Sequence, residues 1–118
     1  MRVLIADAHP EVRWALRTVI REEPGLTIVA EVSNSEHLLD EAQAQHPDLI
    51  LLEWELPGQP GEGLLAELGT LNDGSRVVVL SRQPEARQAA LAAGAEAFVS
   101  KADAPDQLLA ALRRLVHK

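Results

Sequence analysis

Three short stretches of this chain are apolar at every position, and they constrain its fold more than any other feature of the sequence. The runs are Val3–Ile5, Leu49–Leu52 and Val77–Leu80. A strand with one face in water alternates apolar and polar residues, whereas continuously apolar strands are typical of a parallel sheet that helices cover on both faces. We therefore expect these runs to be buried between two layers of helices.

Segments with helical periodicity separate the strand candidates. We expect strands at Val3–Ala6, Thr27–Val32, Leu49–Glu53, Val77–Leu80 and Ala97–Ser100. Apolar residues recur at helical spacing after each of these strands, and the connections are short. This alternation predicts an α/β fold of five strand–helix units, (βα)₅, arranged as a doubly wound three-layer sandwich with right-handed crossovers.

The boundaries of three helices can also be predicted. Ser35 is a residue type that caps helix N-termini, so we expect it to cap the second helix. The fourth helix should run from Pro84 to Ala93 and stop at a glycine. The last helix should begin near 103–105, where a proline fits the first turn.

Composition excludes several classes of protein. The 118 residues include no cysteine, which rules out a disulfide scaffold, a cysteine-ligated metal and thiol chemistry. The net charge is −7, from 11 basic and 18 acidic residues, so we expect no nucleic-acid binding by this chain alone. The longest apolar runs are far shorter than the ~20 residues that cross a bilayer, and no signal-peptide pattern is present, which predicts a cytoplasmic protein without membrane contact.

Polar residues gather where the predicted strands end. Asp7 follows the first strand, Glu53 ends the third, Ser81 follows the fourth and Lys101 follows the fifth. Ligands of open α/β sheets bind beyond the carboxyl ends of the strands. Two acids, a hydroxyl and a lysine at one edge suit a divalent cation together with a phosphoryl-like anion.

Four linked motifs resemble the response-regulator receiver domain of two-component signalling, and they cover nearly the whole chain in the family's order. The motifs are residues 3–13 (VLIADAHPEVR), 47–61 (PDLILLEWELPGQPG), 77–81 (VVVLS) and 94–101 (GAEAFVSK). The His9-Pro10 pair is most similar to receivers that precede a helix-turn-helix output domain. The resemblance implies a flavodoxin-like strand order of 2-1-3-4-5. It also implies that residues 1–118 form a single receiver-like domain, the N-terminal part of a longer transcriptional regulator.

The resemblance also assigns roles to the edge residues, and two positions depart from the family pattern. In the family, an aspartate at the position of Glu53 accepts a phosphoryl group from a histidine kinase. That aspartate, two adjacent acids after the first strand and a backbone carbonyl two residues further on, here Glu55, hold Mg²⁺. This chain keeps Asp7 but has Ala8 at the second acidic position, and it has Glu53 in place of the acceptor.

These departures predict an atypical receiver, or pseudo-receiver, that works without phosphorylation and is not an enzyme. A misplacement of about 1 Å can cost on the order of 10²-fold in a positioned reaction, and glutamate moves the carboxylate by more than that. Loss of an acid also weakens the metal that neutralises charge in phosphoryl transfer. The expected magnesium site at Asp7, Glu53 and Glu55 is therefore weak, and a histidine kinase is a doubtful partner.

The longer side chain of Glu53 has a second interpretation. It can extend toward Lys101 and Ser81, where a phosphoryl oxygen would lie in the family. Ser81 and Phe98 occupy the family's switch positions, so Glu53 would lock the domain either on or off. The segment from Ser81 to Gly94 is about two residues shorter than is usual in the family, which predicts a fourth helix that starts late or loses most of a turn.

Partners and two alternative functions complete the sequence-based hypotheses. Trp14, Arg17 and Arg82 are candidates for a protein-binding surface, since exposed tryptophan and arginine are enriched at interfaces. The expected partners are proteins, either a second copy or an output domain. The alternatives are a phosphorylatable, magnesium-dependent receiver of a two-component system and a flavodoxin-like module that binds a small ligand.

Overall fold

A computed structural model describes residues 1–71, 74–102 and 106–116 of the chain. It contains one five-stranded parallel sheet in the order β2-β1-β3-β4-β5. The strands are β1 (Arg2–Ala6), β2 (Thr27–Val32), β3 (Leu49–Glu53), β4 (Arg76–Ser81) and β5 (Ala97–Ser100). The predicted strands and strand order are confirmed, with β1 starting one residue earlier and β4 longer by one residue at each end.

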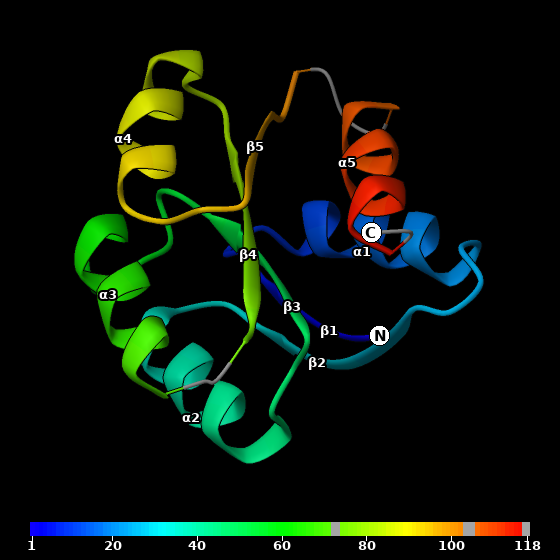
Figure 1. Cartoon of the computed structure of the whole chain (residues 1–118), viewed down its shortest axis with the longest axis horizontal. Helices are drawn as coiled ribbons and strands as arrows, with labels where there is room; N and C mark the ends of the chain where they lie inside the picture. Colours follow the sequence, from blue (N-terminus) through cyan, green and yellow to red (C-terminus); the bar gives the residue numbers. More distant parts are fainter. Residues whose placement is uncertain (72–73, 103–105, 117–118) are drawn as a thin grey trace.

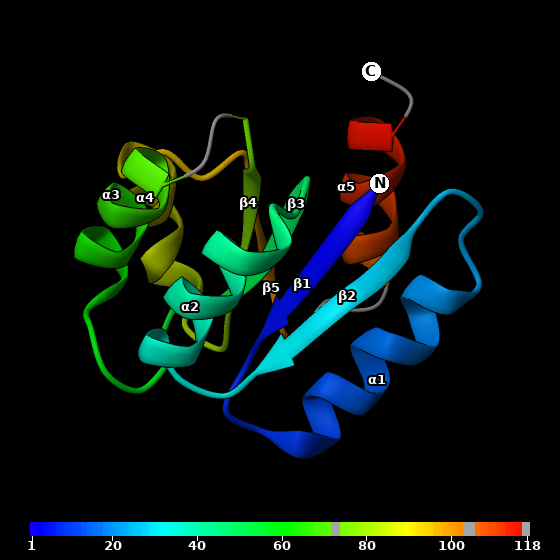
Figure 2. The same cartoon turned by 90° about the horizontal axis from the view of Figure 1, so that it is seen from below.

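Helices cover both faces of the sheet, as Figures 1 and 2 show: α1 and α5 lie on one face, and α2, α3 and α4 lie on the other. The helices are α1 (Pro10–Arg21), α2 (Ser35–Gln45), α3 (Gly61–Leu71), α4 (Arg87–Ala92) and α5 (Asp106–Val116). None of the helices within the described ranges is long and apolar enough to span a membrane.

The apolar runs divide their side chains between two cores. Leu4, Ile50 and Val79 pack toward α2, α3 and α4, whereas Ile5 and Leu51 pack toward α1 and α5. All five side chains are fully buried. Because successive residues of a strand point to opposite faces, a strand buried on both faces must be apolar at every position. The three-layer prediction is therefore confirmed.

Two helix predictions need correction: the cap of α2, and the bounds of the fourth helix, which runs from Arg87 to Ala92 and not from Pro84 to Ala93. Asn34, and not Ser35, caps α2: its side chain accepts a hydrogen bond from the backbone N–H of His37 at 2.9 Å. Ser35 is instead the first helical residue, and its hydroxyl accepts from the backbone N–H of Gln59 in the loop after β3. A single 3₁₀ turn, Pro84–Ala86, precedes α4, so the prediction of a late-starting fourth helix is confirmed. The predicted start of the last helix lies outside the described residues.

Candidate functional site

The carboxyl ends of the strands bring the predicted polar residues to one edge of the sheet. Asp7 follows β1, Glu53 ends β3 and Ser81 ends β4. Lys101 follows β5, and its backbone N–H donates to the carbonyl of Ser81 at 2.8 Å, which holds its side chain over the same edge. Parallel pairing in register is what places these residues together.

The ammonium group of Lys101 joins the two acids. Its Nζ lies 2.8 Å from Oδ2 of Asp7 and 2.8 Å from Oε2 of Glu53. Asp7 is 1% exposed, Glu53 is 3% exposed, and the side chain of Lys101 is 9% exposed. Charges this deeply buried persist only when they are paired and hydrogen-bonded. The expected approach of Glu53 to Lys101 is confirmed, and Asp7 contacts the same ammonium.

The carboxylate of Glu53 is also held on its other side. Its Oε1 accepts a hydrogen bond from the backbone N–H of Ala8 at 3.0 Å, and its Oε2 lies 3.2 Å from Nδ1 of His9. The extra methylene of glutamate lets the side chain extend from β3 to the loop between β1 and α1. Both oxygens at the acceptor position therefore have partners within the chain.

His9 is a part of the site to which the sequence interpretation assigned no role. Its Nδ1 lies 3.0 Å from Oδ1 of Asp7, and its backbone N–H donates to the same oxygen at 2.9 Å. The available signal was its position two residues beyond the first buried acid at the ligand-binding edge. His9 is also the N-cap residue of α1, but its side chain makes no capping hydrogen bond, so the imidazole is directed to the site.

Ser81 is bonded to a nearby glutamate and to the backbone that follows it. Its hydroxyl donates to Oε2 of Glu55 at 2.7 Å and accepts from the backbone N–H of Gln83 at 3.0 Å. The hydrogen bonds described for the carboxylate of Glu53 are with Lys101 and the loop after β1, and its predicted extension toward Ser81 stays a prediction. The resemblance gives Glu55 a role through its backbone carbonyl, and sequence spacing gives no signal for its side-chain contact with Ser81.

A magnesium ion, which the resemblance implies, does not fit this donor set. Mg²⁺ requires near-octahedral oxygen ligands and is held in proteins by carboxylates together with water. Ala8 supplies no oxygen from its side chain, and the carboxylate of Glu53 already has partners in Ala8, His9 and Lys101. Asp7 is left as the single acid of the family's pair.

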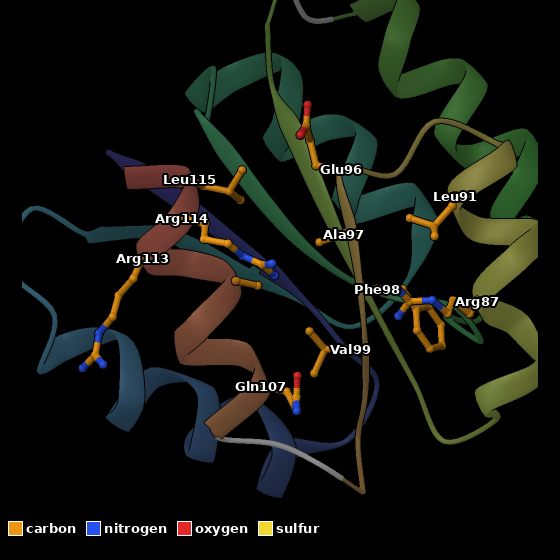
Figure 3. A pocket seen from close by; sticks show the side chains of 11 residues that line it. Arg87, Leu91, Glu96, Ala97, Phe98, Val99, Gln107, Arg113, Arg114 and Leu115 are labelled. Atoms are coloured by element: carbon orange, nitrogen blue, oxygen red, sulfur yellow. The ribbon is translucent and has the colours of Figure 1, made fainter. Parts of the chain in front are cut away.

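Phe98 is not part of this charged cluster: it lies within β5, and its side chain belongs to the core on the face covered by α4. It is 9% exposed and belongs to the core beneath α4, and it also lines an open groove of about 1020 Å³ between α4 and α5. Figure 3 shows Arg87 and Leu91 of α4 beside it, while Arg113 of α5 points away from the groove. Arg113 pairs there with Glu23 at 2.8 Å. The role of Phe98 in a switch stays a prediction.

The three residues of the predicted partner surface differ in their surroundings. Trp14 is 63% exposed on α1, and Arg82 is exposed after β4. Arg17, in contrast, is engaged within the chain: its guanidinium donates two hydrogen bonds to the carboxylate of Glu31, at 2.6 and 2.8 Å. A bidentate pair of this kind leaves Arg17 less able to bind a partner than the sequence suggested.

The Arg17–Glu31 pair makes the stability of the chain depend on pH. The hydrogen bond from Arg17 holds the pKa of the Glu31 carboxyl below its ordinary value. Because the pKa is lower in the folded state, the stabilisation is complete above the unfolded pKa and is lost as pH falls through the folded one. We expect Arg17→Gln to lower the urea midpoint at about pH 7 and to lower it less at about pH 3. An equal deficit at both values would contradict this assignment, and Arg114→Gln is the control, since Arg114 is exposed on α5.

Comparison with known proteins agrees with this architecture. The family model described as "Response regulator receiver domain" matches residues 3–113. The nitrate/nitrite response regulator protein NarL of Escherichia coli is 35% identical over 114 residues, which are 95% of this chain and 53% of that protein. The chain thus spans about half the length of this curated relative.

Two solved structures are similar along nearly the whole chain. A two-component response regulator of the LuxR family from Aurantimonas sp. has a TM-score of 0.87 and 25% identity, and the match covers 98% of this chain and 84% of that one. The RcsB response regulator of Salmonella typhimurium has a TM-score of 0.92 and 25% identity, with coverages of 99% and 61%. The chain therefore belongs to the response regulator receiver domain family.

Proposed function

We propose that this chain is a receiver domain that signals without being phosphorylated, and that it is a non-catalytic interaction module. The observation that supports the proposal most directly is that both carboxylate oxygens of Glu53 already have partners. Its two carboxylate oxygens are taken by the backbone of Ala8, the ammonium of Lys101 and the imidazole of His9. A phosphoryl donor would have to displace these partners from a side chain that is 2% exposed.

Two defects act together against phosphoryl transfer. The acceptor carboxylate lies beyond the place an aspartate would give it, and a misplacement of about 1 Å costs on the order of 10²-fold in a positioned reaction. The missing acid at Ala8 removes a charged ligand of the metal that neutralises charge during the transfer. Each defect lowers the rate independently, so we expect no useful phosphorylation.

A fixed signalling state follows from the same contacts. Lys101 already pairs with a carboxylate at the acceptor position, and Ser81 already donates to the carboxylate of Glu55. In a phosphorylatable receiver, these two groups would bind the phosphoryl oxygens once the acceptor is modified. We infer that both groups are permanently satisfied here, so the face formed by α4, β5 and α5 keeps one conformation.

The setting of this module is inferred from its relatives. The NarL match is described as a response regulator, and RcsB is described in connection with DNA interaction. We propose that residues 1–118 form the N-terminal receiver of a cytoplasmic transcriptional regulator whose DNA contacts lie outside this domain. The net charge of −7 supports this division, because an acidic domain repels the phosphate backbone. Its partners would be proteins, namely a second copy or an output domain.

The proposal is tested by incubating the chain with Mg²⁺ and a small phosphodonor and then measuring its intact mass. We expect the mass to stay unchanged, because Glu53 is enclosed and the metal site is incomplete. A receiver that keeps all of its acids serves as the positive control. A stable gain of one phosphoryl group on Glu53 or Glu55 would overturn the proposal and favour a working two-component receiver.

A further inference from the structure

A cavity of about 330 Å³ lies between α1 and α5, on the face of the sheet that these two helices cover together (Figures 1 and 2). Its apolar lining comes from α1, β4 and α5 and consists of Val12, Ala15, Leu16, Val19, Leu80 and Leu108. Sites that bind small molecules have volumes of about 300–1,000 Å³ and are lined mainly by apolar groups. The cavity therefore has the size and the lining of a site for a small apolar ligand.

The apolar stripe that α1 contributes to this cavity is only partly covered by the fold. Leu16 is buried, whereas Val12 and Val19 are half-buried and Ala15 is exposed. Their spacing places all four side chains on one stripe of the helix, facing the cavity. A ligand with an apolar body would remove the outer part of this stripe from water, and such burial favours binding.

Two basic residues complete the lining, and both follow the carboxyl end of a strand: Arg82 comes after β4 and Lys101 after β5. The ammonium of Lys101 is already engaged, since it lies 2.8 Å from both Asp7 and Glu53. The side chain of Arg82 is exposed, and a guanidinium presents its N–H donors in one plane, which suits a carboxylate. Arg82 is therefore the group from which we expect a ligand to accept hydrogen bonds.

The charges beside the cavity limit the charge of the ligand. Asp7 and Glu53 together carry two negative charges against the single positive charge of Lys101. This surplus repels a dianion such as phosphate more strongly than a monoanion, because the repulsion grows with the charge of the ligand. One arginine beside an apolar cavity thus favours an apolar molecule that ends in a single carboxylate.

We propose that the cavity between α1 and α5 binds a small apolar monocarboxylate, with its hydrocarbon body between the two helices and its carboxylate on the guanidinium of Arg82. The site uses no metal and none of the hydrogen bonds that hold Glu53. Because Lys101 lines the cavity and also contacts Glu53, the ligand would lie against the residue that holds the acceptor position. A regulatory role for this contact rests on the proposed function, whereas the binding itself does not.

Calorimetric titration of the whole chain with octanoate tests this proposal, with octanamide as an uncharged analogue of the same length. We expect one octanoate to bind per chain, octanamide to bind more weakly, and inorganic phosphate not to compete. Ala15→Leu should abolish binding, because the larger side chain fills the cavity from an exposed helical position where leucine is well tolerated. Ala44→Leu, the same change at an exposed position of α2, is the matched control and should bind like the parent.

Arg82→Met separates the carboxylate from the apolar body. It should weaken octanoate binding on the order of 10-fold and leave octanamide binding unchanged, because it removes only hydrogen bonds to a charged group. Arg87→Met is the control, since Arg87 is exposed on α4 and lies outside this cavity.

Absence of saturable octanoate binding, or equal octanoate affinity in the parent and Arg82→Met, would overturn the proposal. A dimer that Ala15→Leu dissociates in sedimentation would also overturn it, because a second copy would then occupy the cavity. None of these results changes the intact mass after treatment with a phosphodonor, so failure here is distinguishable from failure of the proposed function.

Discussion

We expect the double substitution Glu53→Asp with Ala8→Asp to make the chain accept a phosphoryl group from a small phosphodonor in the presence of Mg²⁺. The shorter acid withdraws from the backbone of Ala8 and the imidazole of His9, which hold Glu53 at 3.0 and 3.2 Å. The second acid restores a charged ligand for the metal. Intact mass should show the gain at a rate on the order of 10²-fold or more above the parent.

Single substitutions serve as controls for this result. Ala8→Asp alone keeps the long side chain of Glu53 at the carboxyl edge of the sheet, so we expect this variant to stay unphosphorylated. Glu53→Asp alone should react slowly, because the metal still lacks one acid. If the double variant remains as inert as the parent while it folds normally, the geometric account of what this receiver has lost is wrong.

Lys101→Met should strongly destabilise the fold. Its ammonium lies 2.8 Å from both Asp7 and Glu53, whose side chains are 1% and 2% exposed. Without it, two buried carboxylates face each other, and the imidazole of His9 is the side chain left beside both of them. Removing one member of a buried charge pair typically costs about 3–5 kcal/mol of unfolding free energy. That is a large fraction of the unfolding free energy of a whole domain, which is roughly 5–15 kcal/mol. Urea denaturation measures the loss.

Arg82→Met is the matched control for this loss, because it removes an exposed positive charge near the same edge of the sheet. It should change the unfolding free energy by about 0.5 kcal/mol or less. Adding Glu53→Gln to Lys101→Met should recover part of the loss, since only one buried negative charge then remains. If Lys101→Met is as stable as Arg82→Met, the ammonium does not hold the two acids together in solution.

The three central strands, β1, β3 and β4, could be predicted because they are apolar on both faces. A strand that helices cover on both sides has no face in water, so the continuously apolar run Leu49–Leu52 identifies a central strand without further information. Helix starts were harder, since they depend on which of two adjacent capping residues bonds the backbone. Asn34 and Ser35 are both good caps, and the loop after β3 decides between them by taking the hydroxyl of Ser35.

The site was only partly predictable for a related reason. The strand ends fix the backbone of Asp7, Glu53 and Lys101, so their meeting follows from the topology. The partners of His9 and Glu55 depend instead on side-chain rotamers, which place the imidazole on Asp7 and the second glutamate on Ser81. Sequence spacing gives neither of these choices, so the contact between Ser81 and Glu55 could not be predicted.

Crystals of the chain soaked with Mg²⁺ and beryllofluoride, a phosphoryl mimic, give the most direct test of whether the acceptor position is closed. The account predicts electron density for Glu53 still hydrogen-bonded to the backbone of Ala8 and paired with Lys101, with neither ion seated against its carboxylate. Density for both ions bound at Glu53, with Lys101 turned to the fluorides, would contradict it.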